Sequence, residues 1–149
     1  MDTISITEYI KPYQKQNIFK GVFACDSMPS RFSFPAAFVI NLSPHDEPGS
    51  HWVALYIGKS GVAFYFDSFG MKATNFYVNA FLRMHTKKVI FNKKQLQHIS
   101  SNKCGQFCCV FVVNALKECA IDNFISRFGM NLYVNDFILE NMFNYLKIK

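Results

Sequence analysis

The chain has 149 residues, half of them apolar and 17 of them phenylalanine, and its formal net charge is +6. This composition excludes a disordered chain and predicts one folded domain over residues 1–149. No apolar stretch reaches the roughly 18 residues of a transmembrane helix, and MDTISITEYIK lacks the features of a signal peptide, so we expect neither membrane binding nor secretion.

The first third of the chain predicts one helix and one strand. Ser5–Glu8 (SITE) matches a capping box that opens a short helix ending before Pro12. Residues 17–35 contain glycine and proline breakers and are expected to be irregular. Residues 36–42 (AAFVINL) are typical of a buried strand, and residues 43–50 (SPHDEPGS) of a loop.

The middle of the chain predicts a β-hairpin followed by a helix. Residues 52–57 (WVALYI) and 62–66 (VAFYF) indicate two strands joined by the turn GKSG. Residues 73–85 carry apolar side chains at helical spacing, and residues 88–91 indicate a further strand.

Two helices are predicted in the last third. Residues 104–116 are almost wholly apolar, which indicates a buried helix. The final helix is expected to be capped by Asn135 or Asp136 and to place apolar residues, from Leu139 to Leu146, on one face. Central strands with helices around them favour the α+β class.

Cys104 lies where a polar loop meets the predicted buried helix. The positive end of a helix dipole lowers the pKa of a thiol and favours the reactive thiolate. Free backbone N–H groups at the same helix end can face an oxyanion. Cys104 is therefore the candidate nucleophile, and nothing activates the thiols of the other cysteines.

A nucleophilic cysteine needs a base, and His51 is the best placed of the four histidines. It opens a predicted strand at the edge of the sheet. Asp67 ends the neighbouring strand of the hairpin, so it comes within reach of His51 and can fix the tautomer of the ring. Asp46 and Glu47 are alternatives to Asp67 that lack such a register argument.

Gln97 lies in the loop that leads to Cys104. A glutamine amide at this place can donate to an oxyanion, although a loop glutamine taken alone is a weak signal. A zinc site built from cysteines 104, 108 and 109 with His98 is disfavoured, because this spacing inside an apolar helix suits a closed tetrahedral site poorly. We expect no metal.

These residues, in this order, resemble the adenovirus maturation protease family (adenain) and, more distantly, the proteases that remove SUMO-like modifiers. The resemblance is carried by His51-Trp52, by FDSFG around Asp67, by Gln97-x6-Cys104 and by the run CGQFCCVFVVNAL. It covers roughly residues 51–116 and extends weakly to the segment that contains Asp26.

The resemblance implies a fold and a set of roles. The fold is the α+β, adenain-type variant of the papain-like clan, with a central nucleophile-bearing helix on a mostly antiparallel sheet and flanking helices. The implied catalytic residues are His51 as base, Asp67 as its partner, Gln97 as oxyanion donor and Cys104 as nucleophile. Trp52, Gly105 and Asp26 are expected to contact the substrate.

The substrates implied are viral precursor polypeptides cut at glycine-containing sites during particle maturation. The expected setting is the host nucleus or cytoplasm and the virion, and the expected form is a monomer that needs no cofactor. Two features depart from the adenovirus pattern: Asp67 replaces the usual glutamate, and residues 86–92 lack the cysteine that would bind an activating peptide.

DNA stimulation stays open because the stretch from Ser68 to Lys117 contains no Asp or Glu but many basic residues. A solvated basic face and a nucleic-acid footprint both explain such a stretch. The candidate contacts are Arg83, Lys87, Lys88, Lys93 and Lys94. Two further hypotheses remain: a modifier-deconjugating protease, and a non-catalytic nucleic-acid-binding domain on the same fold.

Overall fold

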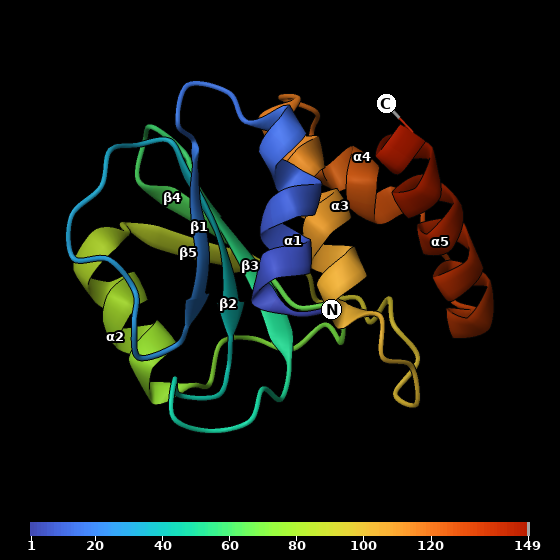
Figure 1. Cartoon of the computed structure of the whole chain (residues 1–149), viewed down its shortest axis with the longest axis horizontal. Coiled ribbons are helices and arrows are strands. Elements are labelled where there is room, and N and C mark those ends of the chain that lie inside the picture. The colour runs from blue at the N-terminus through green and yellow to red at the C-terminus, as the bar shows by residue number, and fades with distance from the viewer. Residues whose placement is uncertain (149) are drawn as a thin grey trace.

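The computed structural model describes residues 1–148 and contains a five-stranded sheet with helices on both faces (Figure 1). The strands are β1 (Phe19–Ala24), β2 (Ala36–Asn41), β3 (Trp52–Ile57), β4 (Val62–Phe66) and β5 (Lys88–Phe91). The helices are α1 (Thr3–Ile10), η1 (Lys11–Tyr13, a 3₁₀ turn), α2 (Phe76–His85), α3 (Cys104–Leu116), α4 (Ile121–Ser126) and α5 (Leu132–Ile148).

The strand order is β1-β2-β3-β4-β5. The pairs β2–β3 and β3–β4 are antiparallel, whereas the outer pairs β1–β2 and β4–β5 are parallel. The predicted α+β fold is confirmed, but antiparallel pairing is confined to the three central strands. The outer strands run parallel because longer connections, one of them α2, return the chain in the same direction.

The structure contains β1 where the sequence predicted irregular chain. Its alternation is interrupted at Gly21, whose φ of 136° and register shift mark a bulge. The strand exists because it pairs with β2, a contact that local pattern does not reveal. Among the described residues, none of the helices is long and apolar enough to cross a membrane.

Two helices begin at residues other than those predicted. The Asp2 carboxylate accepts the Ser5 N–H at 2.8 Å, so Asp2 rather than Ser5 caps α1. At α5, Asn131 accepts the N–H groups of Tyr133 and Val134, at 3.1 and 3.2 Å. Asn135 is instead buried within the helix, and α4 was not predicted at all.

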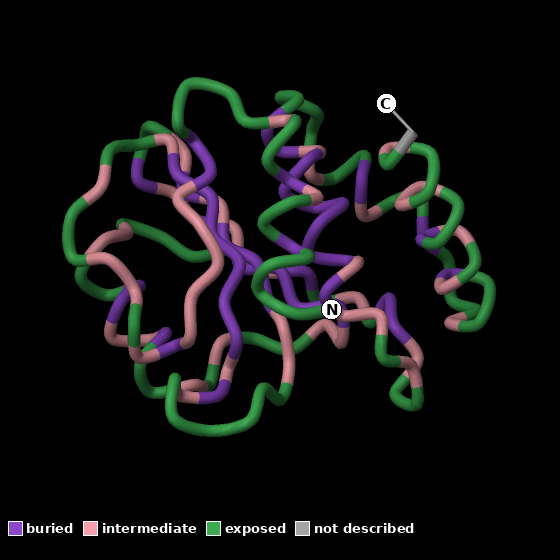
Figure 2. The backbone as a smooth tube through the Cα atoms, in the orientation of Figure 1, coloured by how far each residue is buried: buried purple, intermediate pink, exposed green. Residues whose placement is uncertain are grey.

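Two apolar cores lie on opposite faces of the sheet. One core packs α1, α3, α4 and α5 against side chains that include Val39, Ala54 and Phe66. The other packs α2 against the alternate side chains of β2, β3 and β4. Figure 2 shows that α3 and β2 are buried along most of their length, as predicted for both segments.

The helix that begins at Cys104 is held by aromatic packing. Phe111 of α3 stacks on Phe66 of β4 with ring centroids 4.7 Å apart and an interplanar angle of 9°, and Phe124 of α4 meets both rings edge-on. All three rings are fully buried. This packing fixes α3 against the sheet and therefore fixes the position of its first residue.

We predict that Phe111→Ala lowers the free energy of unfolding by about 3–5 kcal/mol, because it leaves a cavity among buried rings. Urea denaturation measures the change. Phe76→Ala is the matched control, since Phe76 on α2 is 74% exposed. Equal urea midpoints for the two variants would contradict this account of the core.

Candidate active site

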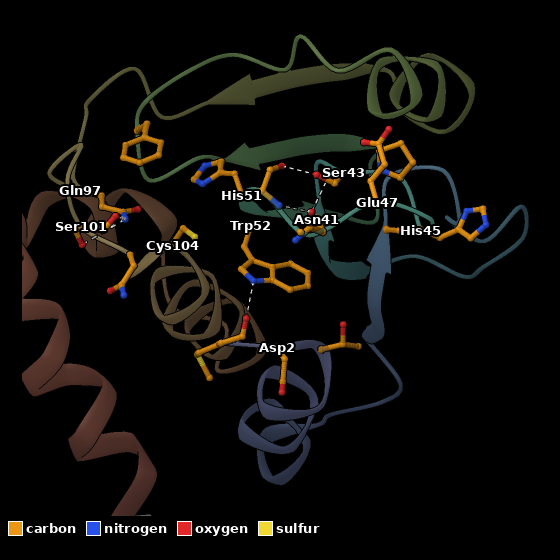
Figure 3. Close-up of a pocket in the computed structure, with 18 of the residues that line it drawn as sticks. Asp2, Asn41, Ser43, His45, Glu47, His51, Trp52, Gln97, Ser101 and Cys104 are labelled. Atoms are coloured by element: carbon orange, nitrogen blue, oxygen red, sulfur yellow. Dashed lines mark hydrogen bonds between the residues drawn. The ribbon is translucent and has the colours of Figure 1, made fainter.

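An open pocket of about 730 Å³ lies where the N-terminus of α3 meets the beginning of β3 (Figure 3). Cys104, His51 and Gln97 line one part of it, and Asn41 and the loop of residues 43–50 line another. The four residues assigned catalytic roles come from the hairpin, from the loop after β5 and from α3, and the structure brings them together.

Cys104 is the first residue of α3 and is partly buried. Burial raises the pKa of its thiol, but hydrogen bonds from His51 and from the backbone N–H groups of Trp52 and Gly105 outweigh this effect. The pKa of Cys104 is consequently lowered, as expected for a thiolate at a helix N-terminus.

His51 lies between Cys104 and Asp67. Its Nε2 is 2.8 Å from Asp67 Oδ1, which leaves Nδ1 for Cys104, the other group that raises the pKa of this ring. Burial lowers the pKa of His51, but the hydrogen bonds with Asp67 and Cys104 outweigh it and raise the pKa to about 9. Together the two shifts favour a thiolate–imidazolium pair near neutral pH.

Asp67 is buried and firmly oriented. Its Oδ1 also accepts the Phe69 N–H at 2.9 Å. Asn92 holds the backbone of Asp67 on both sides: Asn92 Oδ1 accepts its N–H at 3.0 Å and Asn92 Nδ2 donates to its C=O at 2.5 Å. No local pattern indicates Asn92, because only the folded chain brings it to the end of β4.

Gln97 is fully buried beside the pocket, and its amide orientation is fixed. Its Nε2 donates to the Ser101 C=O at 2.8 Å, and its Oε1 accepts from Ser68 Oγ at 2.5 Å. A carbonyl oxygen only accepts, so the nitrogen must lie on the Ser101 side. Nε2 also lies 3.4 Å from Ser101 Oγ, so both of its contacts are with Ser101, and the residue itself lines the pocket.

Three neighbours shape the walls around the sulfur. The Phe69 ring stacks on His51 with centroids 4.7 Å apart, a contact that the sequence analysis missed. Trp52 lines the pocket, and its indole N–H donates to the Met1 C=O at 3.0 Å. Gly105 has no room for a side chain, since a Cβ there would lie 3.1 Å from Met1 and 3.3 Å from Trp52.

Asp26 does not line this pocket. Its carboxylate accepts the His45 N–H at 2.9 Å and lies 2.6 Å from His45 Nδ1, so it anchors the loop that precedes His51. Asp26, His45 and Asp46 bring possible metal-ligating atoms within 4.8 Å of one another, but two of the three already pair together. Cys25, which precedes Asp26, is buried.

The predicted basic contacts separate into two groups. Arg83, Lys87 and Lys88 line a second pocket between α2 and β5, together with Lys72. Lys93 and Lys94 lie outside it, and the Lys94 ammonium donates to the Phe128 C=O.

The fold and part of the sequence are similar to those of viral proteases. No family model matches the chain. Over 101 residues it is 30% identical to a protein of Acanthamoeba polyphaga mimivirus named "Putative thiol protease R355", which covers 61% of this chain and 33% of that protein. Two crystal structures of the ASFV pS273R protease match with TM-scores of 0.52 and 0.50 at 21% and 22% identity. This chain has the fold of that protease.

These structural matches cover 74% and 75% of this chain but 43% and 41% of the ASFV protease chains, and the chain spans about a third of the mimivirus relative. The SUMO protease Ulp1 superposes less well, with a TM-score of 0.39 and 19% identity over 74% of this chain and 54% of its own. The mimivirus relative and the ASFV structures confirm the predicted resemblance to viral cysteine proteases. The single domain over residues 1–149 stays a prediction.

We predict that iodoacetamide alkylates Cys104 faster than Cys119 at pH 7, and that the Cys104 rate falls at a pH below the ordinary thiol pKa of 9.0. The lowered pKa keeps Cys104 as thiolate until the pH drops through the shifted value. Cys119 is exposed and serves as the internal reference in site-resolved mass spectrometry.

His51→Ala removes the partner that lowers the pKa of Cys104, so alkylation at pH 7 should slow in that variant. A Cys104 rate equal to that of Cys119 in the unmodified chain would show that the thiol is not activated.

Proposed function

We propose that this chain is a cysteine endopeptidase that uses Cys104, His51, Asp67 and Gln97. The observation that carries the proposal is the position of His51, whose ring bridges a buried carboxylate and a sulfur at a helix N-terminus. That arrangement supplies a nucleophile, a base and an orienting group in one pocket.

The first half of the reaction forms a thioester. The Cys104 thiolate attacks the scissile carbonyl carbon, and the carbonyl oxygen becomes an oxyanion. The Cys104 N–H has no acceptor within the helix because this residue opens α3. It can hold the oxyanion together with Gln97 Nε2, whose second contact, with Ser101 Oγ, is long at 3.4 Å. The C–N bond then breaks as His51 gives its proton to the leaving amine.

The second half returns the enzyme to its starting state. His51, now neutral, accepts a proton from water, and the resulting hydroxide attacks the thioester carbonyl. The C–S bond breaks, the carboxylic acid product leaves, and Cys104 is again a thiolate beside a protonated His51. Asp67 keeps the imidazole oriented for both proton transfers.

We further propose that the substrates are viral structural precursors cut at glycine-containing sites, in the host cell or in the virion. The viral sources of the mimivirus relative and of the ASFV protease support this choice. Trp52 lines the same pocket as Cys104, and an indole wall there would favour a small residue at the scissile bond.

We predict that Cys104→Ala abolishes cleavage of a glycine-containing precursor peptide, since no other thiol of the described chain adjoins His51. Chromatography of the reaction products measures the loss, and Cys119→Ala should keep full activity. Cleavage by Cys104→Ala would refute the assignment. Preference for a C-terminal SUMO conjugate over the peptide would identify a deconjugating protease instead.

The pocket between α2 and β5 supports a second proposal, that duplex DNA binds there. Four basic residues line the pocket, no acidic residue does, and none of the four has an ion pair among residues 1–148: Lys72, Arg83, Lys87 and Lys88. DNA phosphates would neutralise these charges and release the counterions bound to the DNA. Added salt reduces the free energy gained by that release, so such binding weakens as the salt concentration rises.

We predict that duplex DNA binds in about 50 mM salt and dissociates in about 200 mM salt. The triple variant Arg83→Ala, Lys87→Ala, Lys88→Ala should lose most of this binding in fluorescence anisotropy. Lys11→Ala, Lys20→Ala, Lys147→Ala removes the same charge elsewhere and should keep it. Absence of binding at low salt would leave only a solvated basic face and would exclude the nucleic-acid-binding alternative.

A further inference from the structure

Asn41 lies in the wall of the pocket, one strand away from the proposed catalytic residues. It ends β2 and is directly paired with Trp52 across the β2–β3 ladder. Because side chains alternate along a strand, Asn41 shares the face of Val39, which packs in the core beneath α3. Figure 3 shows Cys104 and Asn41 on either side of Trp52.

The oxygen of the Asn41 side chain is occupied. Oδ1 accepts the Ser43 N–H at 2.9 Å and the Ser50 N–H at 3.3 Å, and the two serine hydroxyls bond to each other at 2.8 Å. Backbone N–H groups only donate, so the atom that faces them must be the oxygen. Asn41 Oδ1 therefore joins the two ends of the loop of residues 43–50. Because the oxygen faces the loop, Nδ2 must point away from these two N–H groups.

The nitrogen of the same amide has no acceptor. Asn41 is only 8% exposed, yet Nδ2 makes no hydrogen bond within residues 1–148. This nitrogen is not one of the buried side-chain atoms of the described residues that lack a partner, so it is open to solvent, and the residue lines the pocket. A donor in this position is ready for an acceptor that enters the pocket.

Gly49 keeps that donor open. A Cβ at Gly49 would lie 2.8 Å from Asn41 Nδ2. The φ of Gly49 is not in the left-handed region, so the turn itself does not require glycine. Lack of a side chain here instead leaves space around the Asn41 nitrogen.

We propose that Asn41 Nδ2 binds a main-chain carbonyl of an extended peptide substrate, an inference that rests on the proposed endopeptidase function. Trp52 and Cys104 line the same pocket, and Asn41 lies one strand spacing of about 4.8 Å beyond Trp52. An extended chain advances about 3.3–3.6 Å per residue, so the carbonyl belongs to a residue about two or three positions from the scissile bond.

Such a hydrogen bond recognises the main chain of the substrate and does not depend on the identity of its side chains. It would hold an extended segment in register across Trp52 and so bring a defined peptide bond to the Cys104 sulfur. Asn41 is thus assigned to substrate binding, and the loop clamp through its oxygen is a separate role of the same side chain.

Asn41→Asp separates the two roles, because the variant keeps an acceptor for Ser43 and Ser50 but loses the donor. With a peptide that extends at least four residues to each side of the scissile bond, we expect KM to rise about 3- to 10-fold. Asn123 is an exposed residue of α4, so Asn123→Asp introduces the same charge away from the pocket and should leave KM unchanged. Gly49→Ala should also raise KM, and the double variant should add little.

Peptides shortened one residue at a time, first from one end and then from the other, locate the contact. The effect of Asn41→Asp should vanish at the length that removes the bound carbonyl. If Asn41→Asp changed KM equally for peptides of every length, or did not change KM at all, the proposal would be overturned. Asn41 would then serve only to hold the loop of residues 43–50.

Peptide binding provides a readout without catalysis. In Cys104→Ala, fluorescence anisotropy of the labelled long peptide should show weaker binding when Asn41→Asp is added, and equal binding would overturn the assignment. Failure of the unmodified chain to cleave any peptide would instead count against the endopeptidase function, while the binding comparison would still decide the role of Asn41.

Discussion

The contact between the N-terminus of α3 and the first residues of β3 is the constraint on which the site depends. Helix α3 is nearly all apolar and is buried between the sheet and the outer helices, so it cannot rotate or slide without exposing its core face. The stack of Phe111 on Phe66 joins it to the strand that carries Asp67. One packed core thereby fixes both the sulfur and the carboxylate.

In this contact, hydrogen bonds and nearby charges shift the pKa values of His51 and Cys104 in the direction opposite to burial. Burial alone would lower the pKa of His51 and raise that of Cys104, which would leave both groups neutral. Their mutual hydrogen bond, the Asp67 carboxylate and two backbone N–H groups reverse both shifts. Along the sequence, Trp52 adjoins His51 and Gly105 adjoins Cys104, but His51, Asp67 and Cys104 are far from one another. The charged pair is therefore a property of the folded site.

Three side-chain amides hold backbone segments around the pocket. Asn92 grips both backbone groups of Asp67, Gln97 joins its own loop to Ser68 and Ser101, and Asn41 closes the loop that leads to His51. Each amide has a donor and an acceptor, so each can bind two different partners at once. Asn41 has a donor left over on the pocket side, and Gln97 and Asn41 lie on opposite sides of Cys104 (Figure 3).

The amino-acid sequence by itself determined the hairpin of β3 and β4, strand β5 and the buried helix that opens at Cys104. Those features follow from local periodicity and turn residues, which are properties of short segments. The thiol at a helix start indicated Cys104, and the resemblance of the order His, Asp, Gln, Cys to a protease family supplied the other proposed catalytic roles. Tertiary structure alone decided β1, whose pairing with β2 overrides a weak local pattern, and the caps at Asp2 and Asn131, which compete with equally good candidates nearby. It also decided the roles of Asn92 and Asn41, because a lone asparagine has no pattern, and only packing brings it to the backbone that it binds.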